Sequence, residues 1–317
     1  MDKPLYTFLL PAYKAKYLEE ALSSIKYQTF GNFRAIVSDD CSPEDLRSCF
    51  DKVCVDDPRF IYRRNKENIG CKSLVAHWNK LVSLCETDYF IMASDDDVYE
   101  PTFLEEINNL SQKYTDVDLF RARCKKIDGN GMMIAMDLLY EEFMHQLDFV
   151  HVAYNSDFIA CEANYCYRTK AFKENGGFVE FPSAWFTDYA TFFLMSKNGC
   201  CCTKDALFRF RCSDINITSQ WGNPEDSKKK TQACISFYNW MKEFMQSLTE
   251  RLERTPLNKA KVNRIEQRYK SRIAHHFQNH IYHCKWKSFW LLYKSMPDDI
   301  GLSQRRVLLH YLKNRIK

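Results

Sequence analysis

The chain has 317 residues and 45% of them are hydrophobic, so it can bury a sizeable core, and global disorder is excluded. Nine glycines and nine prolines exclude a collagen-like or low-complexity chain. The net charge of +4 is uneven: residues 1–224 are acidic, whereas residues 225–317 carry 20 Lys and Arg against 8 Asp and Glu. We therefore expect a body at about 1–224 and a basic C-terminal region at about 225–317.

The fourteen cysteines do not predict a disulfide framework. Residues 1–4 lead directly into a strand-like segment without the features of an export signal, so we expect a cytoplasmic chain with reduced thiols. No C-x-x-C pair is present, which disfavours zinc-ribbon and redox motifs. Cys200-Cys201-Cys202 lies next to a predicted strand and is expected to be half-buried. No apolar stretch approaches the ~20 residues that span a bilayer.

Strands and helices alternate over the first half of the body, which is the pattern of a mostly parallel sheet. Strands are predicted at Leu5–Leu10, Phe33–Ser38, Phe60–Arg64, Tyr89–Ala93 and Asp118–Cys124, and helices around Leu18–Ile25, Leu74–Cys85 and Pro101–Lys113. Pro11 is expected to end the first strand. The turn signal Asp128-Gly129-Asn130-Gly131 follows the last of these strands.

The rest of the chain is predicted to be mainly helical. Residues 132–180 have no regular pattern, and Gly176-Gly177 marks their end. A helix is predicted at Thr187–Asn198, closed by Gly199, and a short strand at Leu207–Arg211. Beyond Pro224 the chain is expected to be helical, with breaks near Pro256 and Pro297.

Polar residues gather where predicted strands end, which is the edge at which open parallel sheets bind ligands. The first strand is followed by Pro11-Ala12-Tyr13, the second by Asp39-Asp40 and the fourth by Ser94-Asp95-Asp96-Asp97. The sequence has no G-x-G-x-x-G after the first strand and no Walker-type lysine loop, which disfavours a dinucleotide dehydrogenase and a P-loop ATPase.

The acidic run admits two interpretations. Three adjacent carboxylates repel one another, and a cation among them would relieve that repulsion, so the run predicts a site for Mg²⁺ or Mn²⁺. The alternative is that these residues only cap the helix that follows.

Taken in order, these motifs resemble those of glycosyltransferase family 2, which has the GT-A fold. The matching segments are Pro11-Ala12-Tyr13, Asp39-Asp40, Asn68-Ile69-Gly70, the acidic run with its trailing Pro101, Gly176-Gly177-Phe178 and Thr187-Asp188. They span about residues 4–218. The resemblance implies an α/β, Rossmann-like and mostly parallel mixed sheet flanked by helices, to which the sequence adds an α-helical C-terminal region. It also implies an inverting transfer of a sugar from a nucleotide-sugar donor.

The resemblance also implies roles for individual residues. The nucleotide-sugar site would comprise Pro11, Ala12, Tyr13, Asp39, Asp40, Asn68, Gly70, Asp95 and Arg211, in which Asp39 holds the base or ribose. Asp96 would bind the metal directly, and Asp97 is the second metal candidate. Ser94 stands where an aspartate is commonest in the family, so the division of labour between Asp95 and Asp97 stays open.

Asp188 resembles the catalytic base of the family, because an acceptor hydroxyl must lose its proton as it attacks the sugar. The alternative is a helix-start carboxylate that interacts only with the helix dipole. Arg211 is the preferred diphosphate ligand because Asn216-Ile217-Thr218 follows it, as in the family. Arg209 and Arg168 are the alternatives, and outward-facing strand charges are the simpler interpretation.

The resemblance implies a nucleotide-sugar donor, with UDP-sugars first, and a glycan or lipid-linked acceptor in cell-surface polysaccharide synthesis. No nucleic-acid motif is present. The basic helix predicted at Leu302–Lys317 could lie on the inner face of the plasma membrane, pack on the body or join a second subunit as a homo-oligomer; we favour the membrane. His276, His280 and His283 share a helix face with Cys284, but no second ligand pair supports zinc.

Two rival functions were weighed. A sugar-phosphate nucleotidyltransferase also uses an α/β nucleotide domain with Mg²⁺ carboxylates, but it expects a Gly-rich basic loop where this chain has Pro11-Ala12-Tyr13-Lys14. A non-catalytic glycan- or partner-binding protein could keep the same fold without turnover.

Overall fold

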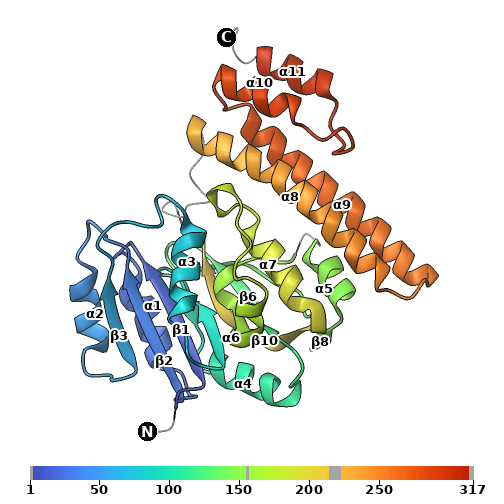
Figure 1. Ribbon diagram of the computed structural model, residues 1–317. Helices are drawn as coiled ribbons and strands as arrows, with labels where there is room; N and C mark the ends of the chain where they lie inside the picture. Colours follow the sequence, from blue (N-terminus) through green and yellow to red (C-terminus); the bar gives the residue numbers. More distant parts are fainter. Residues whose placement is uncertain (1–2, 155–156, 214–222, 314–317) are drawn as a thin grey trace.

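The computed structural model describes residues 3–154, 157–213 and 223–313 and shows a mixed sheet flanked by helices (Figure 1). The strands are β1 Tyr6–Ala12, β2 Phe33–Asp39, β3 Phe60–Arg64, β4 Tyr89–Met92, β5 Val98–Tyr99, β6 Leu119–Ile127, β7 Met133–Met136, β8 Phe143–Met144, β9 Tyr165–Arg168 and β10 Cys200–Arg211. The helices before residue 200 are α1 Leu18–Lys26, α2 Leu46–Cys54, α3 Leu74–Ser83, α4 Phe103–Lys113, α5 Gln146–Ala153, α6 Thr169–Glu174 and α7 Thr187–Met195, with short 3-10 turns η1 Glu162–Asn164, η2 Pro182–Ala184 and η3 Ser196–Asn198. The C-terminal helices are α8 Pro224–Glu250, α9 Pro256–Ile281, α10 Trp286–Lys294 and α11 Gln304–Lys313.

The strand order β3-β2-β1-β4-β9-β6-β10-β5 decides which loops meet. Strands β1 to β4 pair in parallel, and β9 lies antiparallel between β4 and β6. Because β10 pairs in parallel with β6, the carboxyl ends of β1, β2, β4, β6 and β10 all lie at one edge of the sheet. This confirms the predicted α/β sheet and places its predicted strand-end motifs side by side.

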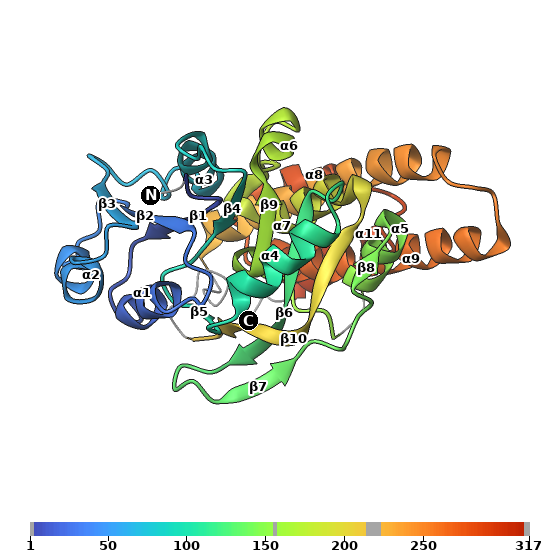
Figure 2. The same cartoon turned by 90° about the horizontal axis from the view of Figure 1, so that it is seen from below.

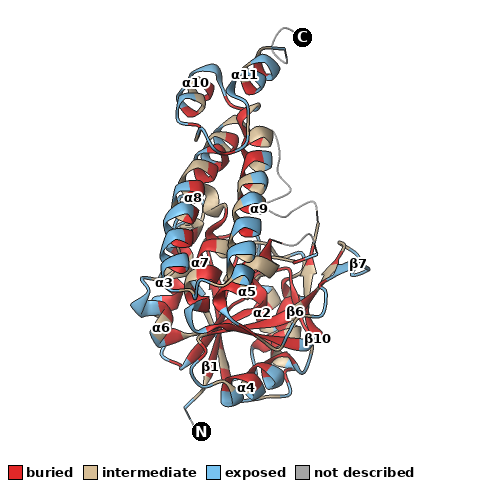
Figure 3. Ribbon diagram, turned by 90° about the vertical axis from the view of Figure 1, so that its right-hand side faces the viewer, coloured by how far each residue is buried: buried red, intermediate tan, exposed pale blue. Residues whose placement is uncertain are grey.

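Both faces of the central strands are covered, which explains their continuous apolar sequences. Phe8 belongs to the hydrophobic cluster under α1, α2 and α4, whereas its neighbour Leu9 belongs to the cluster under α3, α5, α6 and α7. The helix α1 buries Leu18, Ala21, Leu22 and Ile25, as the sequence spacing predicted. Figure 3 shows the buried sheet between its two helical layers.

The C-terminal region is helical, as predicted. Helices α8 and α9 run side by side as a long pair, and α10 and α11 lie near one end of it (Figures 1 and 3). The cluster that contains Leu9 continues into this pair through Phe237 and Tyr269. The structure therefore shows extensive packing across the predicted boundary at residue 224, and the division into two domains stays a prediction. None of the described helices combines the length and apolar character needed to cross a membrane.

Several local expectations were wrong. The strand β1 continues through Pro11 to Ala12, because pairing with β4 ends at Leu9 and the missing amide hydrogen of proline is tolerated where one side is unpaired. The strand β10 starts at Cys200 rather than at Leu207, and the three cysteines are buried rather than half-buried because they lie in the sheet.

The predicted helix Thr187–Asn198 is also divided into α7 and the turn η3. The segment 132–180 contains several regular elements, including the inner strand β9, and the hairpin strand β7 at the margin of the sheet (Figure 2). These elements carry too few residues in a clear period for the sequence to reveal them.

Candidate active site

Asp39 fixes the loops that follow β1 and β2. Its carboxylate is fully buried, and it accepts hydrogen bonds from the Ser42 amide (2.8 Å) and the Tyr62 hydroxyl (2.6 Å) and pairs with Arg64. The Ser42 hydroxyl donates in turn to the Tyr13 carbonyl (2.6 Å). Asp39 therefore acts on Tyr13 through one intervening residue.

Asp40 organises the loop that contains Asn68 and Gly70. Its Oδ1 accepts hydrogen bonds from the Ile69 amide (3.0 Å) and Asn65 Nδ2 (2.7 Å), and its Oδ2 accepts from the Gly70 amide (2.7 Å). A Cβ on Gly70 would lie 2.9 Å from Oδ2 of Asp40, so this close approach requires glycine. Burial raises the pKa of Asp40, but these hydrogen bonds outweigh burial and hold the pKa below its ordinary value.

Asp95 joins the acidic loop after β4 to the loop after β1. Its Oδ2 accepts hydrogen bonds from the backbone amides of Tyr13 (2.7 Å) and Lys14 (2.8 Å). Burial raises the pKa of Asp95, and the two amides oppose that shift. The Tyr13 side chain is 41% exposed, so its ring lies at the surface beside this contact.

Asp97 is directed into the protein, whereas Asp96 is the more exposed of the two neighbours. Asp97 Oδ1 accepts a hydrogen bond from the Arg211 amide (2.8 Å), and Oδ2 accepts one from the Ser94 hydroxyl (2.5 Å). Ser94 thus supports Asp97 at the position where the family most often has an aspartate. Burial, and then the adjacent carboxylate, raises the pKa of both Asp96 and Asp97 above the ordinary value.

The donor set of this loop fits a divalent cation. Burial is the main cause of the raised pKa values, and the adjacent carboxylate adds to it, so a cation bound at this loop would favour the ionised carboxylates. Carboxylate oxygens suit Mg²⁺ and Mn²⁺, and these ions accept water and phosphate oxygens as further ligands. Within the described residues, no three His, Cys, Asp or Glu side chains converge on one metal position. Among the described residues, a cation here would therefore have fewer than three such side chains as ligands and would need others besides them.

Arg211 anchors the acidic loop to α1. Its Nε donates a hydrogen bond to the Asp96 carbonyl (2.8 Å), and its guanidinium pairs with Glu20 (2.5 Å) and stacks over the Tyr17 ring at 4.3 Å. The Glu20 pair engages one of the two terminal nitrogens of Arg211. The Asn216-Ile217-Thr218 motif that pointed to Arg211 lies outside the described residues. The alternative candidates pair elsewhere, Arg209 with Glu100 and Arg168 with Asp118.

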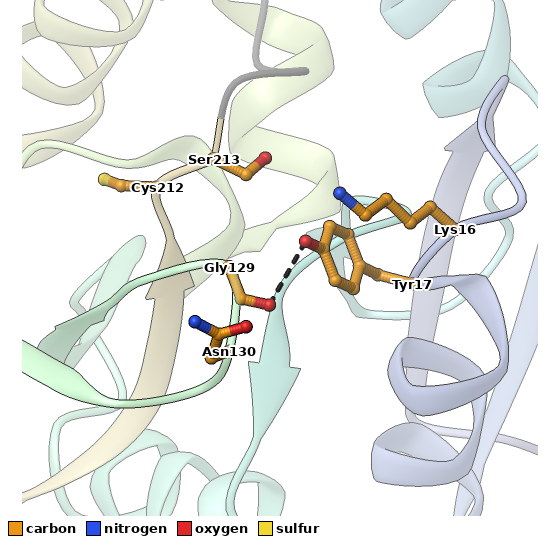
Figure 4. Close-up of a pocket in the computed structure, with 6 residues that line it drawn as sticks. All are labelled: Lys16, Tyr17, Gly129, Asn130, Cys212 and Ser213. Carbon is orange, nitrogen blue, oxygen red and sulfur yellow. Dashed lines mark hydrogen bonds between the residues drawn. The ribbon is translucent and has the colours of Figure 1, made fainter.

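A cavity of about 630 Å³ lies beside this anchor, and Figure 4 shows its lining. The lining residues come from the ends of β1, β6 and β10 and are Lys16, Tyr17, Gly129, Asn130, Cys212 and Ser213. The Tyr17 hydroxyl donates a hydrogen bond to the Gly129 carbonyl (3.2 Å) within this group (Figure 4). None of the six was predicted as a site residue. Their common signal is that each lies a few residues beyond a strand, but only the fold brings those strand ends together.

Asp188 lies in the first turn of α7, where its Oδ1 accepts the Tyr189 amide hydrogen (2.8 Å). Burial raises the pKa of Asp188 to about 6. The turn η1 connects it with the acidic loop: the Cys161 thiol lies 3.8 Å from Asp97 Oδ2, and the Glu162 carboxyl is close enough to Asp188 for the two charges to interact. A carboxyl group with a pKa near 6 can accept a proton at neutral pH.

The structure thus brings most of the predicted residues to one region. Pro11 and Ala12 form the end of β1, next to Tyr13, and their pairing partners in β2 end at Asp39. The chemical roles of all these residues stay predictions.

Residues 7–176 match the protein family described as glycosyl transferase family 2. An uncharacterised glycosyltransferase of Methanocaldococcus jannaschii is 30% identical over 137 residues, which cover 42% of this chain and 46% of the relative. One from Rickettsia prowazekii is 33% identical over 121 residues, covering 37% of this chain and 35% of the relative. One from Haemophilus influenzae is 23% identical over 251 residues, 74% of each chain. The chain therefore spans less than half the length of the archaeal and rickettsial relatives.

Solved structures share the fold at low sequence identity. Staphylococcus aureus TarS residues 1–349, in complex with UDP-GlcNAc, superposes with a TM-score of 0.62 at 17% identity, covering 93% of this chain and 82% of that one. The mannosyltransferase PcManGT from Pyrobaculum calidifontis, in complex with GDP-Man and Mn²⁺, has a TM-score of 0.51 at 12% identity, covering 99% of this chain and 81% of that one.

Proposed function

Because the chain belongs to glycosyl transferase family 2, we propose that it transfers a sugar from a nucleoside-diphosphate sugar to an acceptor hydroxyl. The observation that carries the proposal is the carboxyl edge of the sheet, where Asp95 joins the Tyr13 loop to an acidic loop that fits a cation. TarS binds UDP-GlcNAc in a related fold, which supports a UDP-sugar as the first donor to test.

We assign the nucleoside to the edge formed by Pro11–Tyr13 and the loop Asn68–Gly70. Asp40 shapes the second loop through two backbone hydrogen bonds, and Asp39 shapes the first through Ser42. A direct contact between Asp39 and the base or ribose requires Arg64 to move aside. This is feasible, because the Arg64 side chain is 48% exposed although its partner is buried.

The diphosphate belongs beside Asp96, with Mn²⁺ or Mg²⁺ held by that carboxylate and Asp97 behind it. When bound, the cation neutralises the charge that develops on the leaving diphosphate. Lys16 contributes positive charge to the lining of the cavity of Figure 4, and Arg211 stacks on Tyr17 of the same lining. The cavity volume has room for part of a donor. Asp95 keeps the acidic loop and the β1 loop together while the donor binds.

The transfer step assigns the base role to Asp188. Its carboxylate accepts the proton of the acceptor hydroxyl while the hydroxyl oxygen forms a bond to the anomeric carbon. The bond between that carbon and the diphosphate oxygen breaks on the opposite face, which inverts the configuration. The products are the glycoside, the nucleoside diphosphate and a protonated Asp188. A pKa of about 6 leaves Asp188 mostly ionised, and ready for this role, at neutral pH.

For the acceptor we propose a glycan or a lipid-linked oligosaccharide in cell-surface polysaccharide synthesis, at the cytoplasmic face of the membrane. The helix α11 buries Val307 and Tyr311, and the Tyr311 ring stacks 3.5 Å from Phe289. Contact with an anionic lipid surface would therefore use the exposed Leu309 of α11 together with the exposed Trp286 and Leu291 of α10. Sedimentation with vesicles that contain phosphatidylglycerol tests this part, and equal recovery with neutral vesicles would contradict it.

A donor screen by thermal unfolding tests the proposed function. UDP-GlcNAc, UDP-glucose and GDP-mannose are each added with and without Mn²⁺, because a ligand that binds the folded chain raises its melting temperature by mass action. We expect one nucleotide-sugar to stabilise the wild type more strongly when Mn²⁺ is present. The proposal fails if no donor stabilises the chain and none is hydrolysed or transferred.

A further inference from the structure

Helices α8 and α9 pack against the segment that delivers Asp188 (Figure 1). In that segment Ser183 and Phe186 have φ angles of 57° and 69°, which non-glycine residues keep only where their surroundings impose them. The α8 helix supplies these surroundings. Phe237 stacks on the Phe186 ring at 4.4 Å, and Asp226 accepts the Ser183 hydroxyl hydrogen at 3.0 Å. The backbone before Asp188 is thus held by the C-terminal region.

The α9 helix reaches the residue next to Asp188. Arg272 donates hydrogen bonds to the Tyr189 hydroxyl and to the Ala153 carbonyl (3.3 Å). Its guanidinium carbon lies 5.3 Å from the centroid of the Tyr189 ring and 5.1 Å from that of the Tyr154 ring. Arg272 therefore contacts the residue that follows Asp188 in the first turn of α7.

We propose that Arg272 is a positioning residue for Asp188: it fixes the first turn of α7 through Tyr189 and places a cation next to that turn. The helix pair α8–α9 is then part of the active centre and more than an appendage. The inference rests on the proposed function for what Asp188 does in the reaction. The coupling between Arg272 and Asp188 is a property of the folded chain, so it can be measured without substrate.

The other titratable groups around Asp188 do not supply this charge. Glu162 of η1 has its pKa raised well above the ordinary value by burial, and it accepts the hydroxyl hydrogen of Tyr167 in β9 (2.6 Å). Burial also raises the pKa of Tyr154, Tyr167 and Tyr189, so these groups are neutral where Asp188 titrates. Arg272 is the described cation whose charge opposes the effect of burial on the pKa of Asp188.

A purely structural role for Arg272 is the competing interpretation. Its bond to the Ala153 carbonyl caps the end of α5, and Arg268 likewise donates to the Tyr154 carbonyl (3.4 Å). A cap of this kind stabilises the fold but leaves the ionisation of Asp188 unchanged. The experiment must therefore report on the titration of Asp188 and not only on stability.

The test compares the unfolding free energies of the wild type, Asp188→Asn, Arg272→Met and the double variant across pH ~4.5 to ~8. In the wild-type background, the stability gained by Asp188→Asn should develop between pH 3.8 and about 6, with a midpoint of about pH 5, halfway between those values. In the Arg272→Met background, the upper end of this rise should move upward by roughly one pH unit, and its midpoint by about half of that. At high pH, Asp188→Asn should then lower the unfolding equilibrium constant by about a further tenfold.

Three further variants separate the interpretations. Arg272→Gln keeps a donor for both contacts but removes the charge, so it should shift the midpoint even if Arg272→Met does not fold. Arg272→Lys keeps the charge and should hold the midpoint near its wild-type place. Arg264→Met removes an exposed cation from the same helix and should change nothing. An unchanged midpoint in the two neutral variants overturns the proposal, whatever their loss of stability.

Activity supplies a second, separable readout. The acidic limb of kcat/KM for UDP release from UDP-GlcNAc should move to higher pH in Arg272→Gln and stay in place in Arg264→Met. If Asp188→Asn is fully active, the proposed function is wrong while the coupling measured by unfolding still stands. If Asp188→Asn is inactive but the midpoint in Arg272→Gln is unshifted, the proposed function stands and the positioning role is wrong.

Discussion

Replacing Asp188 with asparagine should inactivate the enzyme and stabilise its fold at the same time. The ordinary pKa of this carboxyl is 3.8, and burial raises it to about 6 in the folded chain. A difference of about two pH units corresponds to roughly 3 kcal/mol of differential interaction between the two protonation states. At neutral pH the ionised carboxylate therefore destabilises the folded wild type by this amount. The neutral amide of asparagine avoids that loss.

The pH dependence fixes the sign of the effect. Because the folded-state pKa is the higher one, the folded chain binds the proton more tightly than the unfolded chain between pH 3.8 and about 6. The wild type therefore loses stability relative to Asp188→Asn as pH rises through this window. Above about pH 6 the difference is complete, and below 3.8 it vanishes because the carboxyl is protonated in both states.

Urea unfolding at pH ~7.5 and pH ~4 measures this difference, with UDP release from UDP-GlcNAc as the activity assay. We expect Asp188→Asn to raise the free energy of unfolding by up to about 3 kcal/mol at the higher pH and by far less at the lower pH. Its turnover should fall by about 10²- to 10⁴-fold. Asp148→Asn is the matched control, since that carboxylate pairs with Lys261 and should gain nothing. A variant that is equally destabilised at both pH values, or that keeps its turnover, refutes the reasoning.

Two other substitutions test the architecture of the site. Gly70→Ala places a Cβ 2.9 Å from Asp40 Oδ2, so we expect the loop to shift and donor affinity to fall by about tenfold in a thermal-shift titration; unchanged affinity would contradict a role for this loop. Arg211→Met removes the donor to the Asp96 carbonyl, and urea unfolding should show a loss of about 2–4 kcal/mol. Arg209→Met removes a more exposed ion pair and should lower the free energy of unfolding by less than about 1 kcal/mol. A loss as large as that of Arg211→Met would contradict the anchoring role of Arg211.

The sequence predicted those parts of the fold whose pattern is local. The α1 helix shows its buried face in its spacing, and β2 and β4 are apolar runs that stop at aspartates. The inner strand β9 was missed because four residues carry no period of their own, and its place is set by pairing with β4 and β6. The start of β10 could not be predicted, because the three consecutive cysteines show no strand-like alternation of apolar and polar residues.

The candidate site was predictable to the same extent. Asp39, Asp95 and Asp188 could be found because each stands at the end or start of a readable element. The backbone contact of Asp95 with Tyr13 could not, since it joins loops 82 residues apart. Arg272 has no local signal either, because the packing of α9 on α7 alone brings it to Tyr189. Long-range contacts of this kind are decided by tertiary packing rather than by sequence spacing.

The central claim is that one edge of the sheet binds a nucleotide-sugar with a cation at Asp96 and turns it over with Asp188. Titration calorimetry with UDP-GlcNAc and Mn²⁺, combined with the UDP-release assay on Asp96→Ala and Asp188→Asn, tests it most directly. We expect Asp96→Ala to lose the Mn²⁺-dependent part of donor binding, and Asp188→Asn to bind the donor like the wild type while releasing no UDP. Donor binding and turnover that are unchanged in both variants would contradict the account.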